Sequence, residues 1–334
     1  MTINRRAGCS RRAAACTFLA ALGSLSAHPA FADAFPSKPI HLIATAAPGG
    51  ASDIIARRLA KVIEAQSGAN IVVENKAGAS GSIGLVATIR APKDGYTVVI
   101  AVPDAVTIYP LMKKVRPYEG EKDLSPIAQV GETHFIFAVN AANSANTLRE
   151  FVNNIKRKPG SRPSFASAGN GTTGRLVTEM LMQQTGIEMV HVPYRSSAPA
   201  LLGVAGGEAE IMATSVASAK ALVDGGRVKM IGVTRDTKMP GFEGIPTVVE
   251  SGLPGLVVPV WWGVFGPPNL PADVHEKLAT LFLNAINSDD MRAQLATLGL
   301  EARPRGPAEF AAFLRKDTQM WQDVIRKSNI PPED

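Results

Sequence analysis

The chain has 334 residues, few cysteines and little aromatic character, with Phe, Trp and Tyr making up 6% of the sequence. Its two cysteines, Cys9 and Cys16, both precede residue 17, so the rest of the chain has no thiol, disulfide or cysteine metal site. A chain of this length can do without disulfides, because its cores are large enough to stabilise it. After Ala32 no apolar run is long enough to predict a membrane span.

The first 32 residues have the pattern of a secretory signal peptide. Four arginines lie between positions 5 and 12, Ala13 to Ala27 is uncharged and largely apolar, and Ala30-Phe31-Ala32 offers small residues for cleavage near Ala32. This predicts export to the periplasm. Sec and twin-arginine export both stay open, although Ala14 stands where a twin-arginine signal prefers a bulky apolar residue. Cys16 lacks the preceding leucine of a lipidation site.

The positive charge of the chain belongs largely to that segment. Without its four arginines the net charge falls from +6 to +2. Nucleic-acid binding therefore loses its main support, and we expect no nucleic-acid partner.

Beyond the leader, short apolar runs alternate with amphipathic stretches. Ile40–Ala44, Asn70–Glu74 and Thr97–Val102 are predicted strands, and Asp53–Gln66 and Ile83–Ala91 are predicted helices. The order strand, loop, helix predicts a largely parallel sheet covered by helices.

The same order returns further along the chain and predicts a second α/β lobe. Ile127–Asn140 is a candidate for a strand that crosses between the lobes, and 229–234 and 257–265 are candidates for the return. The C-terminal helices at 274–287 and 310–327 are assigned to the first lobe by analogy. The predicted domains are a signal peptide at 1–32, lobe 1 at 33–135 with 256–334, and lobe 2 at 136–255.

Three loops rich in glycine and hydroxyl groups each follow a predicted strand and precede a predicted helix. They are 48–53, 78–82 and 167–173. Helix N-termini present unpaired N–H groups and partial positive charge, so such loops favour an anion site without a metal. The alternative is that Ser52, Ser82 and Thr172 only cap their helices. Three such loops in two lobes indicate a cleft between the lobes.

Other chemistries have weaker support. Gly169 to Gly174 fits G-x-G-x-x-G, but Arg195 stands where a dinucleotide site needs an acid. No G-x-S-x-G occurs, and His41, His134, His191 and His275 lack the spacing of a zinc site. We therefore expect no cofactor, no metal and no catalysis.

Several single residues have two interpretations. Asp53 is expected to favour the dipole of its helix, or else to order water near a ligand. Asp104 is expected to be a cap, or else a partner for a ligand amine. One of Trp261 and Trp262 should pack in a core, while the other lines the cleft.

An ordered series of motifs resembles the Bug (TctC-type) extracytoplasmic binding proteins of tripartite tricarboxylate transporters. The series covers nearly the whole chain after the leader, and its order is far more specific than any one motif. It includes Ala47-Pro48-Gly49-Gly50, residues 72–81, Pro92-Lys93-Asp94-Gly95-Tyr96-Thr97, His191-Val192-Pro193-Tyr194-Arg195 and Ser251-Gly252-Leu253-Pro254-Gly255.

The resemblance implies a type II periplasmic-binding-protein fold, α/β in class, with two lobes joined by crossing strands and a ligand cleft between them. It implies a small carboxylate ligand and membrane transporter subunits as partners, and a monomer is expected. Together with the loop pattern it gives these candidate ligand-binding residues: Ala47, Pro48, Gly49, Ser52, Asp53, Ser80, Asp104, Ser167, Gly169, Gly171, Thr172, Thr173, Ser196, Ser197, Thr214 and Ser215.

The chain also departs from the family pattern. Thr45-Ala46 replaces a usual proline and phenylalanine, which should change the shape or polarity of the pocket floor. Arg175 stands where histidine is common and is expected either to meet a second carboxylate or to face solvent. Ligand identity stays open. The alternatives to a transport role are a partner that presents ligand to a membrane kinase and an exported α/β hydrolase or dehydrogenase.

Overall fold

A computed structural model describes residues 1–2, 35–158 and 160–332. The chain divides into two compact units, residues 1–37 and 38–334, and the second holds all the helices and strands discussed below. The predicted signal peptide lies outside the described residues apart from Met1 and Thr2. Among the described helices, none has both the length and the apolar character that crossing a membrane requires.

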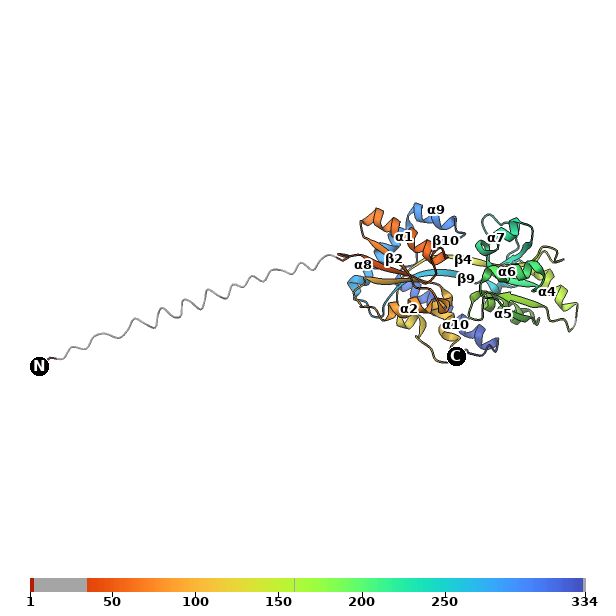
Figure 1. Cartoon of the computed structure of the whole chain (residues 1–334), viewed down its shortest axis with the longest axis horizontal. Helices are drawn as coiled ribbons and strands as arrows, with labels where there is room; N and C mark the ends of the chain where they lie inside the picture. Colours follow the sequence, from red (N-terminus) through yellow and green to blue (C-terminus); the bar gives the residue numbers. More distant parts are fainter. Residues whose placement is uncertain (3–34, 159, 333–334) are drawn as a thin grey trace. The chain divides into compact units, whose positions relative to one another are not determined.

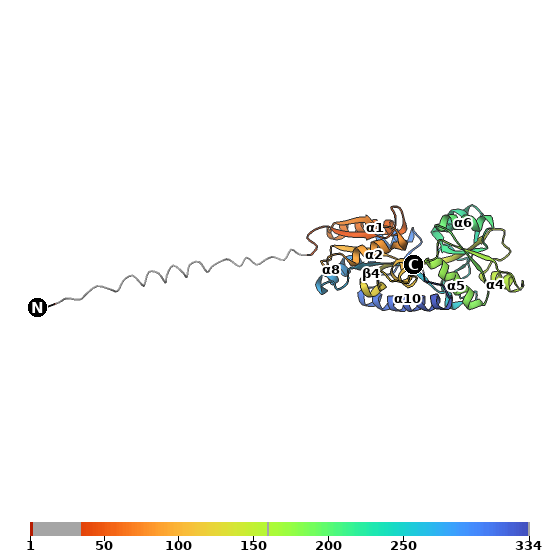
Figure 2. The same ribbon diagram turned by 60° about the horizontal axis from the view of Figure 1, so that its bottom comes forward.

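Lobe 1 is built on the parallel strands β1 (Ile40–Ala44), β2 (Ile71–Asn75) and β3 (Thr97–Ala101). Helix α1 (Ala51–Ser67) ends at Gly68, whose left-handed backbone lets its N–H cap Glu64 O. Helix α2 (Ser82–Ile89) follows β2. The two helices lie on opposite sides of the sheet (Figures 1 and 2). The predicted strands and helices of this region are confirmed.

Lobe 2 repeats this arrangement. Strand β5 (Ser164–Ser167) lies parallel to both β6 (Val190–Pro193) and β7 (Ile211–Ser215), and β8 (Val228–Val233) adds an antiparallel strand through its pairing with β4. The helices are α4 (Leu148–Lys156), α5 (Thr173–Thr185), α6 (Ser197–Gly206) and α7 (Val216–Asp224). Helix α4, which the sequence pattern did not predict, begins at a Thr147 cap that accepts a hydrogen bond from Glu150 N.

Two antiparallel strands connect the lobes. Strand β4 (Ser125–Asn140) pairs with β9 (Pro259–Gly266) in lobe 1 and with β7 and β8 in lobe 2, so the strand order is β2-β1-β3-β9-β4-β7-β5-β6. Thr234 joins the connections: its hydroxyl accepts from Phe135 N at 2.9 Å and donates to Val258 O at 3.1 Å. The crossing strands are thus confirmed, whereas the lobe boundaries at 135/136 and 255/256 stay predictions.

The C-terminal segment does not belong to lobe 1 alone. Helices α8 (Ala272–Asn287) and α9 (Asp289–Ala296), with the short strand β10 (Glu301–Ala302), lie on lobe 1. Helix α10 (Pro307–Lys327) runs along both lobes (Figure 2). Its Phe310 packs in the lobe 1 core, while Trp321 and Val324 pack with lobe 2 side chains. A helix of 21 residues is about 30 Å long, enough to reach from one lobe to the other.

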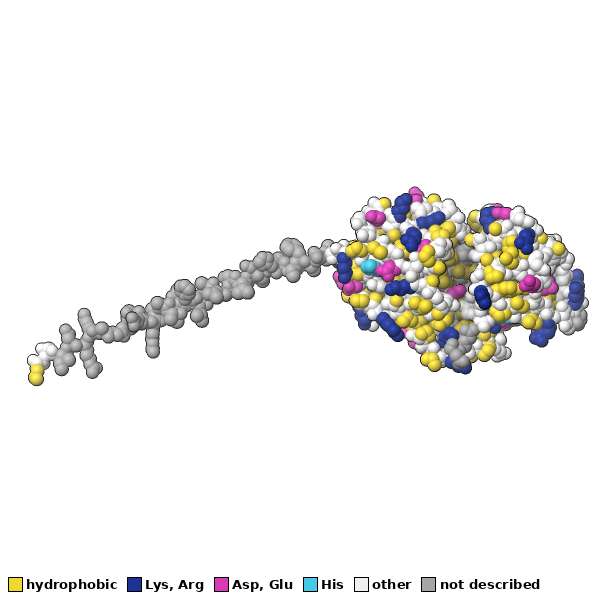
Figure 3. Space-filling model, viewed as in Figure 1, with side chains coloured by type: hydrophobic (Ala, Val, Ile, Leu, Met, Phe, Trp, Pro, Cys, Tyr) yellow, Lys and Arg dark blue, Asp and Glu magenta, His cyan; other side chains and the backbone are white. Residues whose placement is uncertain are grey.

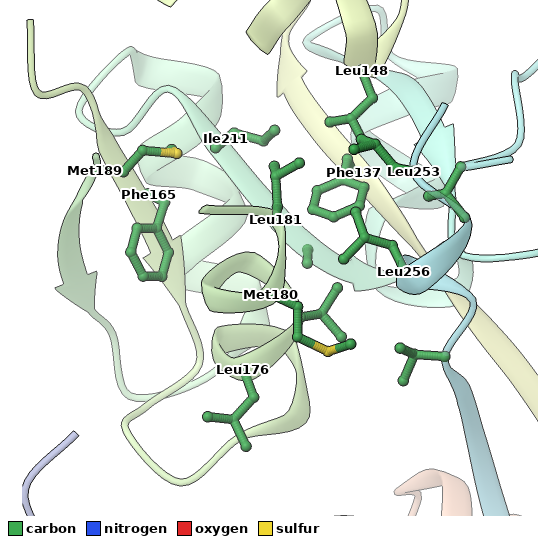
Figure 4. Close-up of a cluster of buried hydrophobic side chains, with 14 of the residues drawn as sticks. Phe137, Leu148, Phe165, Leu176, Met180, Leu181, Met189, Ile211, Leu253 and Leu256 are labelled. Atoms are coloured by element: carbon green, nitrogen blue, oxygen red, sulfur yellow. The ribbon is translucent and has the colours of Figure 1, made fainter. Parts of the chain in front are cut away.

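Each lobe has its own apolar core. In lobe 1, Trp261 contacts Phe265 and Phe310 edge-on or tilted. In lobe 2, side chains from α5 meet Phe137 of β4 and Leu256 of the short helix η4 (Pro254–Leu256), as Figure 4 shows. Between the lobes the surface is hollowed (Figure 3).

Candidate functional site

The loop between β1 and α1 in lobe 1 is held by Asp53. This side chain is 3% exposed, and it accepts hydrogen bonds from Gly49 N at 2.9 Å, Arg57 Nε at 2.8 Å and Asn75 Nδ2 at 2.9 Å. Burial acts to raise the pKa of Asp53, but the hydrogen bonds from Arg57, Gly49 and Asn75 outweigh it and the pKa is lowered. Both carboxylate oxygens are thus engaged by the protein.

The other predicted residues of this loop differ in exposure. Ala47, Pro48 and Gly49 are exposed at its tip, while Ser52 is buried. Thr45 is also buried, and its hydroxyl donates to Ile100 O at 3.1 Å. The threonine therefore satisfies its polar group within the sheet, and the expected change in the polarity of the pocket floor does not follow from its hydroxyl.

Ser80 faces the opposite lobe. It lies in the short helix η1 (Ala79–Gly81) with a φ of 54°, and it is exposed. A Cβ placed on Gly171 of lobe 2 would stand 3.9 Å from its hydroxyl oxygen. Two of the three glycine-rich loops thus meet across the boundary between the lobes.

The loop between β5 and α5 in lobe 2 is held in place by hydrogen bonds of Ser167, the last residue of β5. This residue is fully buried; its hydroxyl pairs with the N–H and carbonyl of Gly169 and lies 2.6 Å from His191 Nε2. Burial, helped by the charge of Arg175, lowers the pKa of His191 to about 4, so the imidazole is neutral and stacks on Phe165. Gly169, with a φ of 132°, supplies a backbone conformation that other residues rarely adopt.

Three helices of lobe 2 begin around one small pocket. The N-termini of α5, α6 and α7 contribute Thr172, Ser197 and Ser215 to a cavity of about 110 Å³. Its remaining lining residues are Asp104, Phe135, Ala168, Gly174, Met212, Ala213 and Thr214. Thr173 N of α5 and Ser218 N of α7 already donate to Asp104 and Ser215, but the remaining N–H groups and the three helix dipoles favour negative charge in one place.

Asp104 enters this pocket from lobe 1. It begins the helical turn η2 (Asp104–Ile108) after β3, and its Oδ1 accepts hydrogen bonds from the N–H of Thr173 at 3.2 Å and from the Thr173 hydroxyl. Burial raises the pKa of Asp104, while the bonds from Thr173 oppose that rise. Asp104 is thus a cap, as expected, but it caps a helix of the opposite lobe rather than its own.

The structure therefore brings together only part of the predicted site. Asp104, Thr172, Ser197, Thr214 and Ser215 line the pocket, while Thr173 adjoins it and Ser80 faces Gly171 nearby. Other candidates lie outside it: Ser167 and Gly169 shape the loop, Ser196 is exposed, and the lobe 1 residues Ala47, Pro48, Gly49, Ser52 and Asp53 form a separate loop. Their contact with a ligand stays a prediction.

Sequence reasoning missed Phe135, Ala168, Met212, Ala213 and Gly174 as lining residues. Phe135 ends the lobe 1 part of a crossing strand, and nothing in its local sequence marks it as a pocket residue. Gly174 is needed because a Cβ there would stand 2.5 Å from Ala213 O. The G-x-G-x-x-G spacing was thus a usable signal, but its last glycine serves helix–strand packing rather than a phosphate.

Arg175 and the tryptophans are occupied elsewhere. Arg175 Nε lies 3.6 Å from Glu179 Oε1, and the guanidinium donates a hydrogen bond to Asn170 O at 3.4 Å, which fixes it to the loop before α5. Trp261 is fully buried and Trp262 is 8% exposed, so both belong to the interior rather than one to the cleft.

A larger cavity of about 310 Å³ lies between η2, the short helix η3 (Gly120–Asp123) and α10. It carries charges of both signs, including Arg116, Glu119 and Arg315, and none of the glycine-rich loops opens onto it. The small pocket between the lobes is therefore the better candidate site. In residues 35–158 and 160–332, no three His, Cys, Asp or Glu side chains are placed to hold a metal ion.

The fold and this pocket define a two-lobed solute-binding protein. The chain belongs to the TctC family, described as the tripartite tricarboxylate transporter family receptor, which matches residues 55–330. Solved structures similar to this chain include the periplasmic binding protein BugD and a TctC solute binding protein from Polaromonas.

Individual relatives cover most of the chain. A UPF0065 protein from the tcbD-tcbE intergenic region of Pseudomonas sp. strain P51 is 34% identical over 88% of this chain and 87% of its own. An R. palustris protein solved with adipate has a TM-score of 0.78 and 25% identity, over 90% of this chain and 100% of that one. The periplasmic binding protein BugD has a TM-score of 0.75 and 26% identity, with the same coverage.

Proposed function

We propose that this chain captures a small carboxylate between its lobes and delivers it to the membrane subunits of a tripartite tricarboxylate-type transporter. The observation that carries the proposal is the meeting of three helix N-termini in one pocket that a lobe 1 residue closes from the other side. Backbone N–H groups and hydroxyls there hold a carboxylate without lysine or metal. The adipate bound to the R. palustris relative supports the same ligand class.

Capture works through lobe closure about the connecting strands. Strands β4 and β9 and the contacts of Thr234 form the connection, while Ser80 and Asp104 of lobe 1 meet lobe 2 on the pocket side. A ligand that makes contacts with both lobes binds the closed form better, so it shifts the equilibrium toward closure. The closed form is the one that the transporter would receive.

Export places the protein where it meets such ligands. The signal-like segment at 1–32 supports Sec or twin-arginine export with cleavage near Ala32, and the family is periplasmic. Mass spectrometry of the protein recovered from the periplasm should give a chain that begins at Asp33, and native spectra should show a monomer. A retained leader or a lipid adduct on Cys16 would contradict this.

The protein catalyses no reaction in this proposal. The contact between Ser167 and His191 resembles a nucleophile and its base, but Ser167 is fully buried and its hydroxyl is engaged with Gly169. No described carboxylate orients His191. A hydrolase needs an accessible nucleophile and an oriented base. Chemical change of a bound carboxylate during incubation would overturn this part.

Native mass spectrometry of protein purified without refolding, followed by thermal-shift titration of mono-, di- and aromatic carboxylates, tests the ligand class. A ligand at a hundred times its Kd stabilises the folded state by about 2.7 kcal/mol, which should raise the Tm by about 4 °C. If none of the carboxylates shifts the Tm, the proposal fails.

Substitution of the helix α5 N-terminus tests the place of binding. The double variant Thr172→Ala/Thr173→Ala removes the hydroxyl that ties the pocket-lining Thr172 to Gly169 O and the one that holds Asp104 in place, so it should weaken binding of the identified carboxylate about tenfold or more. The matched control is Thr185→Ala at the other end of the same helix, where the hydroxyl bonds to Leu181 O. Equal affinity in both variants would move the site away from this loop.

A further inference from the structure

Asp104 has one carboxylate oxygen that the protein does not use. Its Oδ1 accepts from the N–H and the hydroxyl of Thr173, whereas Oδ2 accepts no hydrogen bond from any described residue. Asp104 also lines the pocket between the lobes. A molecule in that pocket can therefore donate a hydrogen bond to this second carboxylate oxygen.

The charges around the pocket leave Asp104 without a compensating cation. It is the only ionisable residue among those that line the cavity. Arg175, on the same helix as Thr173, is held by Glu179 and by Asn170 O. No ion pair of the described residues includes Asp104. A second negative charge near the ionised Asp104 would be repelled, and a cation would be attracted.

The occupied end of α5 also decides where a ligand carboxylate goes. Asp104 already accepts from the first turn of α5, and the Ser215 hydroxyl accepts from Ser218 N in the first turn of α7. The N-terminus of α6, which has no side-chain cap and carries Ser197 into the pocket, is therefore left for the ligand. A carboxylate there and a donor at Asp104 Oδ2 would share one small cavity of about 110 Å³. The pocket thus combines a helix start that suits an anion with a carboxylate that suits a cation.

From this geometry we infer that Asp104 determines the ligand class: the site takes a monocarboxylate that carries an ammonium or a similar cationic donor, and it disfavours dicarboxylates. The inference rests on the proposed function and sharpens it. It separates this chain from the R. palustris relative solved with adipate, a dicarboxylate.

The test compares ligands that differ only at one end. Isothermal titration calorimetry would measure 4-aminobutanoate against glutarate and 5-aminopentanoate against adipate, each with the wild-type protein. We expect the amino member of at least one pair to bind tenfold or more tightly than its dicarboxylate. Asp104→Asn, which keeps the shape, should reduce that ratio at least tenfold. Asp94→Asn, an exposed acid paired with Lys38, should leave it unchanged.

The outcomes distinguish the inference from the function on which it rests. A wild-type preference for the dicarboxylates, or a ratio that Asp104→Asn does not change, overturns the role of Asp104 and leaves carboxylate capture standing. If only carboxylates without a donor group bind, such as benzoate, the role of Asp104 is likewise overturned and carboxylate capture still stands. If no carboxylate binds, both fail. The wild-type ratios decide even if Asp104→Asn does not fold.

Discussion

The two lobes contain glycine-rich loops of the same sequence type that are stabilised by different acids. In lobe 1, the loop at 47–50 is closed by Asp53, four residues from Gly49 in the sequence. In lobe 2, the loop before α5 is closed by Asp104, 69 residues away and on the opposite lobe. The first arrangement is local and complete within one lobe. The second one joins the lobes and leaves a carboxylate oxygen in the pocket between them.

The comparison shows that glycine and hydroxyl content marks a helix start but not its partner. Both loops have an exposed or half-buried tip, a buried hydroxyl residue and a following helix. What differs is the source of the acid that satisfies the N–H groups. A loop whose N–H groups are bound by an acid of its own helix has few donors left for a ligand. A loop whose N–H group is bound by an acid of the other lobe lies at the boundary between the lobes and is a candidate binding site.

The buried acids of the two lobes differ in a similar way. Glu179 in lobe 2 has Arg175 as a partner, and burial still raises its pKa. Asp317 in lobe 1 has no cationic partner among the described residues. Burial raises the pKa of Asp317 to about 7, although Thr107 and the indoles of Trp261 and Trp321 act against it. Those indole Nε1 atoms make no hydrogen bond of regular geometry.

The largest effect should come from the unpaired acid. Folded Asp317 holds its proton up to about pH 7, while the unfolded chain loses it near pH 4. The contribution of Asp317 to the free energy of unfolding is therefore complete below pH 4 and is lost as the pH rises through 7. The total loss is at most about 4 kcal/mol. Asp317→Asn should remove this fall in the free energy of unfolding, as measured by urea denaturation at pH 4 to 8.

The control for this prediction is Asp323→Asn, an exposed acid on the same helix. Its unfolding free energy should follow the wild-type pH dependence. Burial lowers the pKa of His134 to about 4, so its effect on the free energy of unfolding has the opposite pH dependence: the protein loses stability as the pH falls below 6.5. Only the difference between variant and wild type therefore reports on Asp317. Identical curves for Asp317→Asn and wild type would show that folding does not raise the pKa of Asp317.

A smaller effect should follow from opening the lobe 1 loop. Asp53→Ala removes three hydrogen bonds of a buried carboxylate, so we expect a loss of about 3 kcal/mol in the free energy of unfolding. Urea denaturation at pH 7 measures it. Asp94→Ala should stay within about 0.5 kcal/mol of wild type, because Asp94 is exposed. An equally small change for Asp53→Ala would mean that the loop keeps its shape without it.

The smallest effect distinguishes two glycines of the lobe 2 loop. A Cβ on Gly174 would stand 2.5 Å from Ala213 O, so Gly174→Ala should force α5 from β7 and cost about 2 kcal/mol. Gly171→Ala, whose Cβ would have no heavy atom nearer than 3.9 Å, should change thermal stability by less than about 0.5 kcal/mol. The reverse order would place the close packing in the loop instead of the helix.

Much of the fold could be predicted from local patterns. Strand β1 was predicted with its observed bounds, and α1 and the crossing strand β4 within a few residues, because periodic apolar residues and glycine breaks mark them. Helix α4 was missed because its apolar face is short. The reach of α10 to both lobes was missed because an amphipathic pattern does not say which surface covers it.

The site was only partly predictable. Thr172, Ser197 and Ser215 carry a local signal, a hydroxyl at the start of a helix, and they line the pocket. Asp53 carries an equally strong signal and turned inward to its own loop. The place of Phe135 in the pocket and the contact of Asp104 with Thr173 had no local signal, because both depend on residues far away in the sequence.

The sequence alone determined that two α/β lobes with helix N-termini rich in N–H groups and hydroxyls would form, since these features follow from apolar periodicity, glycine and capping residues within a few positions. Tertiary structure alone decided which helix starts share a pocket and that Asp104 reaches Thr173 of the other lobe. The reason is physical: backbone conformation is set by near neighbours, whereas charge complementarity and access are set by groups that only folding brings together.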